Sequence, residues 1–194
     1  MTIFQLLMLG ASAYFAFKIY EHMQTLQEPE DVKKEDSRTA DAFSIFSPES
    51  LIQRADEAFE NSEYEKAFAL LTEADAKDPK NPDTIFKMAY VLNEKGDTVS
   101  ALNYYANALE LDPKNEYIHN SMASIYRKNK EYASAKMHLS ASIDIEPNNA
   151  VTYYNYGNLL VNMEYEDEAK VMYKKALEIY SDFTEAKEEL EKLS

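Results

Sequence analysis

The sequence contains no cysteine and no tryptophan, and it has only three glycines and three histidines. Without cysteine the chain forms no disulfide, no thiolate zinc site and no iron–sulfur cluster, and it carries no lipid attached through cysteine. Three isolated glycines cannot build the glycine-rich loops that hold phosphates in nucleotide-binding folds. These absences exclude several common classes of redox, metal and nucleotide chemistry.

Catalytic motifs are also missing from the sequence. It has no His-Glu-x-x-His pair, no calcium loop with Asp at alternating positions and no Gly-Lys-Ser loop. His119 is better explained as a packing residue than as a ligand. Adjacent carboxylates such as Glu188 and Glu189 occupy helix positions that do not face each other. We therefore expect no enzyme, no cofactor, no bound metal ion and no small-molecule substrate.

Acidic residues outnumber basic residues by 35 to 20, which gives a formal net charge of −15. An acidic surface repels phosphate backbones, so we do not expect nucleic acid as a partner. The charge has two explanations that the sequence leaves open. It keeps the protein soluble, and it can also steer a basic partner toward the surface.

The first residues are unusually apolar. Residues 3–17 contain no charged side chain, and Lys18 follows them. If Lys18 extends its ammonium outward, the apolar stretch spans about 18 residues, or roughly 27 Å as a helix, close to the ~30 Å of a bilayer core. We predict an N-terminal transmembrane anchor over residues 1–20. The alternatives are a signal peptide cleaved near the small residues 11–13 and a buried or interfacial helix.

Basic residues beside the anchor predict its orientation. None precedes the apolar segment, and a charged linker follows it over residues 21–47, interrupted by Pro29. The positive-inside rule then places the remainder of this single-pass chain in the cytoplasm, with a periplasmic orientation as the alternative. The basic residues that follow the segment are Lys18, Lys33, Lys34 and Arg38.

From residue 48 onward the sequence repeats every 34 residues. Three prolines keep this spacing, and so do three columns of small residues. A 34-residue period with small residues at fixed places and a terminal proline is typical of a helix–turn–helix repeat. The columns are Pro79, Pro113 and Pro147; Ala55, Ala89, Ala123 and Gly157; Ala67, Ala101, Ala135 and Ala169; and Ala74, Ala108, Ser142 and Ala176.

Each column has an expected structural role. The small residues let paired helices approach closely, where a larger side chain would force them apart. Prolines end the second helix of a repeat, and asparagines cap the first helix of the next one. Larger residues are expected to fill the core between repeats. These core residues are Leu71, Tyr105, Leu139 and Tyr173, and the caps are Asn81, Asn115 and Asn149, with Ser47 before Pro48 at the first repeat.

This pattern resembles the tetratricopeptide repeat family over about 70% of the chain. The resemblance implies an all-α fold, namely an α-solenoid of four helix-turn-helix repeats that follows the transmembrane helix and ends in a C-terminal capping helix at 182–194. The repeats occupy residues 48–183, as 48–81, 82–115, 116–149 and 150–183. The family's tryptophan is replaced by Leu51, Ile85, His119 and Tyr153, and Ser181 stands where a fourth proline is expected.

The resemblance also implies a binding site, because the first helices of such repeats line a concave groove. Tyrosines provide rigid apolar area with a polar tip, and asparagines can hold a peptide backbone by paired hydrogen bonds. Some of these side chains can instead serve only to pack neighbouring first helices together. The predicted groove residues are Ile52, Phe59, Phe86, Tyr90, Asn93, Tyr117, Asn120, Ser124, Arg127, Tyr154, Asn158 and Val161.

One ligand of this family is not expected here. Some members bind the C-terminal carboxylate of heat-shock chaperones through lysines and asparagines on successive repeats. The lysines are absent from the matching positions of this chain. Those positions hold Ile52, Asp56, Phe86, Tyr90, Asn120 and Ser124.

The resemblance therefore implies a membrane-anchored scaffold or adaptor whose partners are protein segments. Proteins with this layout help to assemble membrane or envelope complexes, which suggests a bacterial inner membrane. The sequence is also compatible with a eukaryotic organelle membrane, and two alternative roles stay open. One is a translocon-associated, chaperone-like helper that faces the periplasm. The other is a structural subunit whose small residues 10–13 pack its anchor into a larger membrane machine.

Overall fold

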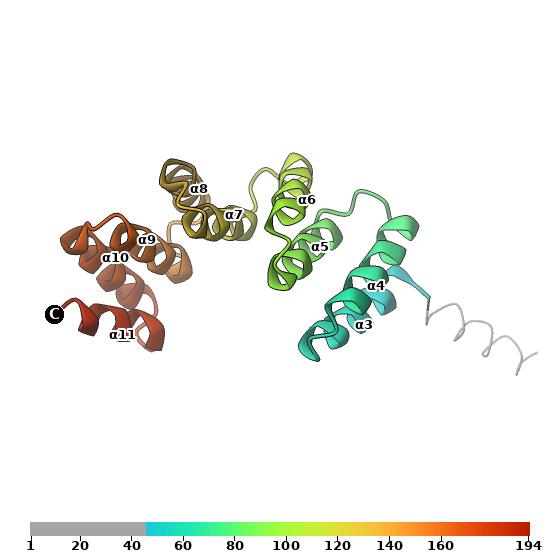
Figure 1. Ribbon diagram of the computed structural model, residues 1–194, viewed down its shortest axis with the longest axis horizontal. Coiled ribbons are helices and arrows are strands. Elements are labelled where there is room, and N and C mark those ends of the chain that lie inside the picture. The colour runs from blue at the N-terminus through green and yellow to red at the C-terminus, as the bar shows by residue number, and fades with distance from the viewer. Residues whose placement is uncertain (1–45) are drawn as a thin grey trace, which may run out of the picture. The chain divides into compact units, whose positions relative to one another are not determined.

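The computed structural model describes residues 46–194, and this part of the chain is helical throughout, with no strand (Figure 1). The predicted anchor at 1–20 and almost all of the linker at 21–47 lie outside the described residues. No helix within residues 46–194 is both long and apolar enough to cross a bilayer.

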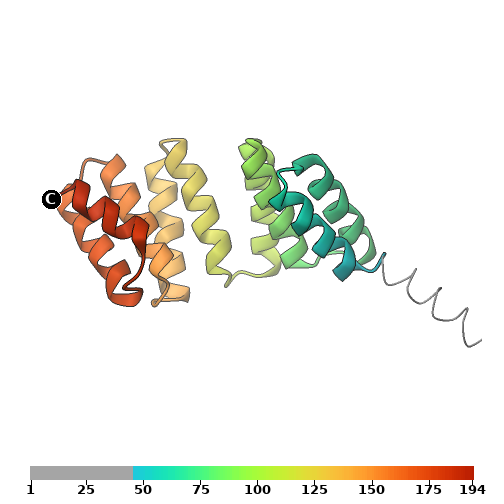
Figure 2. The same cartoon turned by 90° about the horizontal axis from the view of Figure 1, so that it is seen from below.

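Eight of the nine helices in residues 46–194 form four hairpins, and the ninth follows them (Figure 2). Each first helix packs on its own second helix, and each second helix also contacts the next first helix. This arrangement confirms the predicted all-α solenoid. The first helices are α3 (Pro48–Glu60), α5 (Pro82–Lys95), α7 (Glu116–Lys128) and α9 (Ala150–Asn162); the second helices are α4 (Tyr64–Lys77), α6 (Thr98–Leu111), α8 (Tyr132–Ile145) and α10 (Glu166–Ile179); and α11 (Thr184–Lys192) packs on α10.

The first helices begin at the predicted caps. Asn81 Oδ1 accepts hydrogen bonds from the backbone N–H groups of Asp83 and Thr84, at 3.0 and 3.2 Å. Asn115 and Asn149 repeat this arrangement at α7 and α9. Ser47 Oγ accepts from a backbone N–H at the start of α3. Because the first N–H groups of a helix lack partners within it, these side chains define where each repeat begins.

The turn inside each repeat contains one residue in the left-handed region of backbone conformation. The φ values lie between 59° and 94°, yet only one of the four residues is a glycine. A non-glycine residue in this region carries a local energetic cost, so the packing of the two flanking helices must hold the turn in place. The four residues lie 34 apart: Ser62, Gly96, Lys130 and Glu164.

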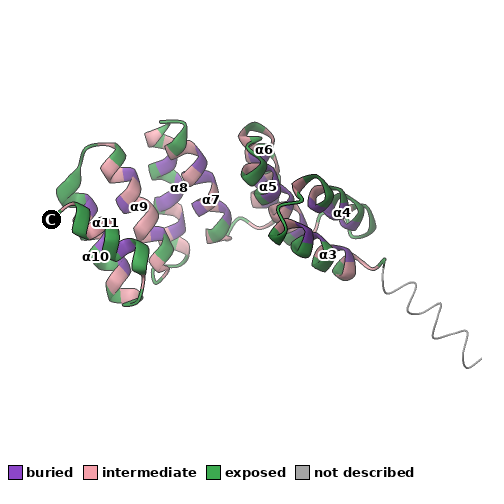
Figure 3. Cartoon of the chain, turned by 60° about the horizontal axis from the view of Figure 1, so that its bottom comes forward, coloured by how far each residue is buried: buried purple, intermediate pink, exposed green. Residues whose placement is uncertain are grey.

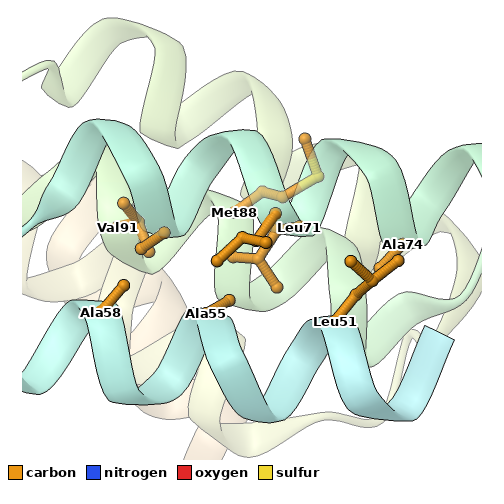
Figure 4. Close-up of a cluster of buried hydrophobic side chains, with 9 residues drawn as sticks. Leu51, Ala55, Ala58, Leu71, Ala74, Met88 and Val91 are labelled. Carbon is orange, nitrogen blue, oxygen red and sulfur yellow. The ribbon is translucent and has the colours of Figure 1, made fainter. Parts of the chain in front are cut away.

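The small-residue columns lie where helices cross. Ala67, Ala101, Ala135 and Ala169 are all 0% exposed. Figure 4 shows the first repeat, where Leu51, Ala55 and Ala58 of α3 face residues of α4 and α5. The buried residues line the helix faces that meet (Figure 3). The four residues predicted to fill the core are also at most 1% exposed: Leu71, Tyr105, Leu139 and Tyr173.

Gly157 replaces alanine in its column for a steric reason. A Cβ atom at this position would lie 2.4 Å from Cε1 of Tyr173. The missing methyl group lets the Tyr173 ring lie against α9, where its hydroxyl donates a 2.8 Å hydrogen bond to Asn158 Oδ1. The glycine is therefore explained by the position of this tyrosine ring and not by any unusual backbone angle. In repeat 2 the equivalent residues are Ala89 and Tyr105, which are both fully buried.

Repeat 3 buries two histidines against each other. Nδ1 of His119 and Nδ1 of His138 are 2.9 Å apart, and the His138 ring stacks on Tyr126 at a centroid distance of 5.4 Å. One Nδ1 must donate and the other accept, so the pair requires a neutral ring. Burial, and then the nearby His119, lower the pKa of His138 to about 4, and burial also lowers the pKa of His119. The structure thus gives His119 a packing role.

We expect Gly157→Ala to lower the free energy of unfolding by about 1–3 kcal/mol, because overpacking outweighs the ~1 kcal/mol that alanine gains in a helix. Urea denaturation measures the change. The control is the same substitution combined with Tyr173→Leu, since leucine occupies this position in repeats 1 and 3. When Tyr173→Leu is already present, adding Gly157→Ala should lower the free energy of unfolding much less than it does in the wild-type protein. Equal losses in both backgrounds would contradict the steric explanation.

The histidine pair predicts a loss of stability in acid. Its pKa values lie below the ordinary 6.5 in the folded state, so the unfolded chain binds more protons as the pH falls. The free energy of unfolding is unaffected by the pair above pH 6.5, where the histidines are neutral in both states. It falls as the pH is lowered toward 4, by about 2–3 kcal/mol for His138. Urea denaturation at pH 7.5 and 4.5 should show a smaller pH dependence in His138→Met, the residue found at this place in repeat 4. An unchanged pH dependence in that variant argues against the explanation.

Candidate binding groove

A pocket of about 480 Å³ lies between the first helices α3 and α5. Its lining is mainly apolar, with aromatic rings from both helices and charged side chains at intervals. Leu71 of α4 and Val91 of α5 contribute aliphatic surface. The lining residues are Ala55, Asp56, Phe59, Leu71, Asp83, Phe86, Lys87, Tyr90 and Val91.

The spacing along α5 explains why this helix supplies so much of the pocket. Asp83, Lys87, Tyr90 and Glu94 follow one another by four, three and four residues, which places them on one stripe of the helix surface. Phe86 lies beside this stripe. The opposite side of α5 carries the buried column residues, so the stripe faces away from α6.

Aromatic contacts hold the pocket walls. The Phe59 ring lies 5.2 Å from the Tyr90 ring, and the Phe86 ring lies 5.7 Å from the ring of the fully buried Tyr105, measured between centroids. Phe59 and Phe86 are half-buried, whereas Tyr90 is 41% exposed. Burial, and then Glu94, raise the pKa of the Tyr90 hydroxyl. It therefore stays protonated at neutral pH and can donate a hydrogen bond to a ligand.

An ion pair joins the two walls. Lys87 Nζ on α5 lies 2.6 Å from Asp56 Oδ1 on α3, and the two side chains are 36% and 50% exposed. Such partly exposed pairs contribute little stability, at most about 1 kcal/mol. The pair nevertheless neutralises the lysine. Asp83 makes no ion pair within residues 46–194, so the pocket keeps an uncompensated carboxylate.

Asn93 supplies an unused acceptor on the last turn of α5. Its Oδ1 is buried and has no hydrogen-bond partner within the described part of the chain, while its Nδ2 donates to Glu94 Oε1 at 3.3 Å. A buried acceptor without a partner costs free energy. Asn93 was predicted to line the groove, but its Oδ1 is buried and the residue is not among those that line the pocket.

The groove differs in repeats 3 and 4, where polar side chains bond to one another. Asn120 is only 7% exposed. Its Nδ2 donates to Ser142 Oγ and Thr152 Oγ1, both at 2.8 Å, and its Oδ1 accepts from Asn155 Nδ2 at 3.1 Å. The structure therefore corrects the prediction that the Asn120 amide faces a ligand, because a buried network uses its hydrogen-bonding groups.

Family models described as tetratricopeptide repeat match most of this domain. One matches residues 58–125, and a second matches 117–149 and 150–183. Together they span well over half of the chain. The chain belongs to the tetratricopeptide repeat family. Repeats of this family typically form non-catalytic scaffolds that mediate protein–protein interactions.

Solved structures of other tetratricopeptide repeat proteins share the fold. MamA from Desulfovibrio magneticus RS-1 is 19% identical with a TM-score of 0.65, over 75% of this chain and 82% of that one. PilF of Pseudomonas aeruginosa is 22% identical with a TM-score of 0.69, over 75% and 67%. The first repeat domain of Spaghetti (RPAP3), solved with the HSP90 peptide SRMEEVD, is 22% identical with a TM-score of 0.55, over 58% and 89%. A search of curated proteins found no match.

The tetratricopeptide fold brings together only some of the predicted groove residues. Phe59, Phe86 and Tyr90 line one pocket. Tyr154 packs on Phe183 at 5.0 Å between centroids, beside the start of the capping helix. Apart from the buried Asn120, the remaining positions are half-buried or exposed, and several contact their own neighbours. Ile52 packs on the repeat 1 core, Arg127 donates to Asn162, Asn158 accepts from Tyr173, Tyr117 is 61% exposed, and Ser124 and Val161 are half-buried.

Asp83 and Lys87 were absent from the predicted groove, and Asp56 appeared only as a mismatch to the chaperone clamp. A signal for the α5 residues was present in the sequence. Their spacing of four residues, continued to Tyr90 and Glu94, marks a single helix face. No sequence signal pointed to the ion pair of Asp56 with Lys87, because those residues lie 31 apart and on different helices.

Proposed function

We propose that this protein is a membrane-anchored scaffold that binds a segment of a partner protein in the groove formed by its first helices. The observation that carries the proposal is the pocket between α3 and α5. A space of about 480 Å³ with an apolar lining is large enough for one or two bulky apolar side chains.

The pocket has the features of a binding hot spot. Aromatic residues supply large apolar area at low entropic cost, because only two side-chain torsions must be fixed. Phe59 and Phe86 are already held by other rings, which reduces the ordering that binding requires. The hydroxyl of Tyr90 adds a polar group that can fix the direction of a bound segment.

Relatives support a peptide ligand of this class. The Spaghetti structure holds a bound peptide, and YrrB is described as having an unusual peptide-binding site. The present groove lacks the lysines that would hold a chaperone carboxylate, and it has Asp56 and Tyr90 at two of those positions. We therefore propose a different segment as the ligand.

Residues 1–20 are proposed to hold the scaffold at a membrane. Residues 27–41, if flexible, would have a root-mean-square span of roughly 20 Å, so the repeats would stay near the bilayer surface. Such confinement raises the effective concentration of the groove toward membrane-bound partners. We propose that the repeats lie in the cytoplasm and help to assemble an inner-membrane or envelope complex.

Photocrosslinking tests the groove. A photoreactive phenylalanine analogue at Tyr90 should give discrete adducts with another protein in cells, because this side chain is 41% exposed at the pocket. The matched control places the analogue at Tyr165, which is 50% exposed and lies outside the pocket lining. Phe86→Ala should remove the adducts formed at position 90 while circular dichroism shows a folded domain. Identical adducts at both positions, or none at position 90, would contradict the groove proposal.

Labelling of a single cysteine tests anchoring and orientation. Because the chain has no native cysteine, Ser194→Cys introduces one probe. We expect the protein in the membrane fraction after an alkaline wash, with the probe protected from an impermeant maleimide until the cells are lysed. Leu7→Asp should release the protein, since a charge costs about 2.5–3.5 kcal/mol at the centre of a spanning helix. Labelling of unlysed cells would favour the periplasmic orientation, and recovery in the soluble fraction would refute the anchor.

A further inference from the structure

Acidic residues outnumber basic residues two to one in the part of the domain that holds the pocket. Residues 48–115 contain fourteen acidic and seven basic side chains, residues 116–163 contain four of each, and residues 164–194 contain ten and five. The ratio at the pocket recurs at the C-terminal end, so net charge by itself does not single out the pocket. The positions of the carboxylates around the pocket decide which segment it can bind.

Carboxylates stand at both ends of the pocket-lining stripe of α5. Asp83 is exposed at its first turn and Glu94 is exposed near its last turn, on the same helix face as Tyr90. At about 1.5 Å per residue, the two positions are roughly 16 Å apart along the helix. Lys87 is the only basic residue that lines the pocket, and it is paired with Asp56. The rim therefore carries two carboxylates that this lysine does not neutralise.

We propose that the pocket between α3 and α5 takes an apolar side chain from a partner segment that carries basic residues on both sides of it. This inference rests on the proposed function and names the chemistry of the ligand. The apolar side chain enters between Phe59, Phe86 and Tyr90. Lysine or arginine side chains of the segment reach Asp83 at one end and Glu94 at the other.

The separation of the two carboxylates sets the spacing of the basic residues. An extended segment rises about 3.3 Å per residue, so its basic residues would lie roughly five positions apart. A helical segment would need about eleven positions. An acidic segment would instead meet like charge at both ends and would be rejected.

Selection from a phage-displayed library of random 12-residue peptides tests the proposal with the full chain in detergent. We expect the enriched peptides to contain a bulky apolar residue flanked by lysine or arginine. By fluorescence anisotropy, Asp83→Asn combined with Glu94→Gln should weaken their binding about threefold to tenfold, because each exposed ion pair is worth about 0.2–1 kcal/mol. Binding of the wild-type protein should weaken as salt is raised, and the double variant should lose most of that dependence.

A matched control removes two acidic charges elsewhere. Glu73→Gln combined with Asp144→Asn alters exposed residues on the second helices α4 and α8, and it should leave binding unchanged. If the control weakens binding as much as the groove variant, overall charge is responsible and the proposal fails.

The outcomes separate this inference from the proposed function. Enriched peptides that are neutral or acidic, yet lose binding in Phe86→Ala, would overturn the basic-segment proposal and keep the groove. Peptides whose binding does not depend on Phe86, or a library without enrichment, would count against the groove itself. Basic, apolar peptides that depend on both Phe86 and the two carboxylates would support both.

Discussion

The close approach of helices at columns of small residues is the constraint on which this structure depends. Paired helices meet at alanines that are completely buried, and a single added methyl group at Gly157 would collide with Tyr173. Since cores are packed without spare volume, these contacts fix how each helix lies on the next. They also shape the groove, because Ala55 belongs to a small-residue column and lines the pocket.

Departures from the columns divide the domain into two halves with different chemistry. Repeats 1 and 2 share an apolar cluster and leave a pocket between their first helices. In repeat 3, Ser142 replaces the usual alanine, and its hydroxyl requires hydrogen-bond partners, which Asn120 and Thr152 supply. A buried polar network of this kind joins repeats 3 and 4 and uses side chains that could otherwise bind a ligand.

Binding chemistry is therefore concentrated at one end of the domain. The aromatic pocket and the carboxylates of α5 both lie in the first two repeats. At the other end, the start of the capping helix packs against Tyr154, and the last apolar surface is covered. A solenoid needs such covering at its ends, so the C-terminal rings serve stability while the N-terminal rings remain accessible.

The sequence by itself determined the helix pairs, their 34-residue register, the asparagine caps and the buried columns, because each depends on local spacing that a helix converts directly into a face. It also pointed to Phe59, Phe86 and Tyr90. Only the tertiary structure decided that Asn120 turns inward, that Tyr154 packs on the capping helix, and that Lys87 pairs with Asp56. These outcomes depend on distances between side chains on separate helices. Those distances are set by helix packing and not by the order of residues within one repeat.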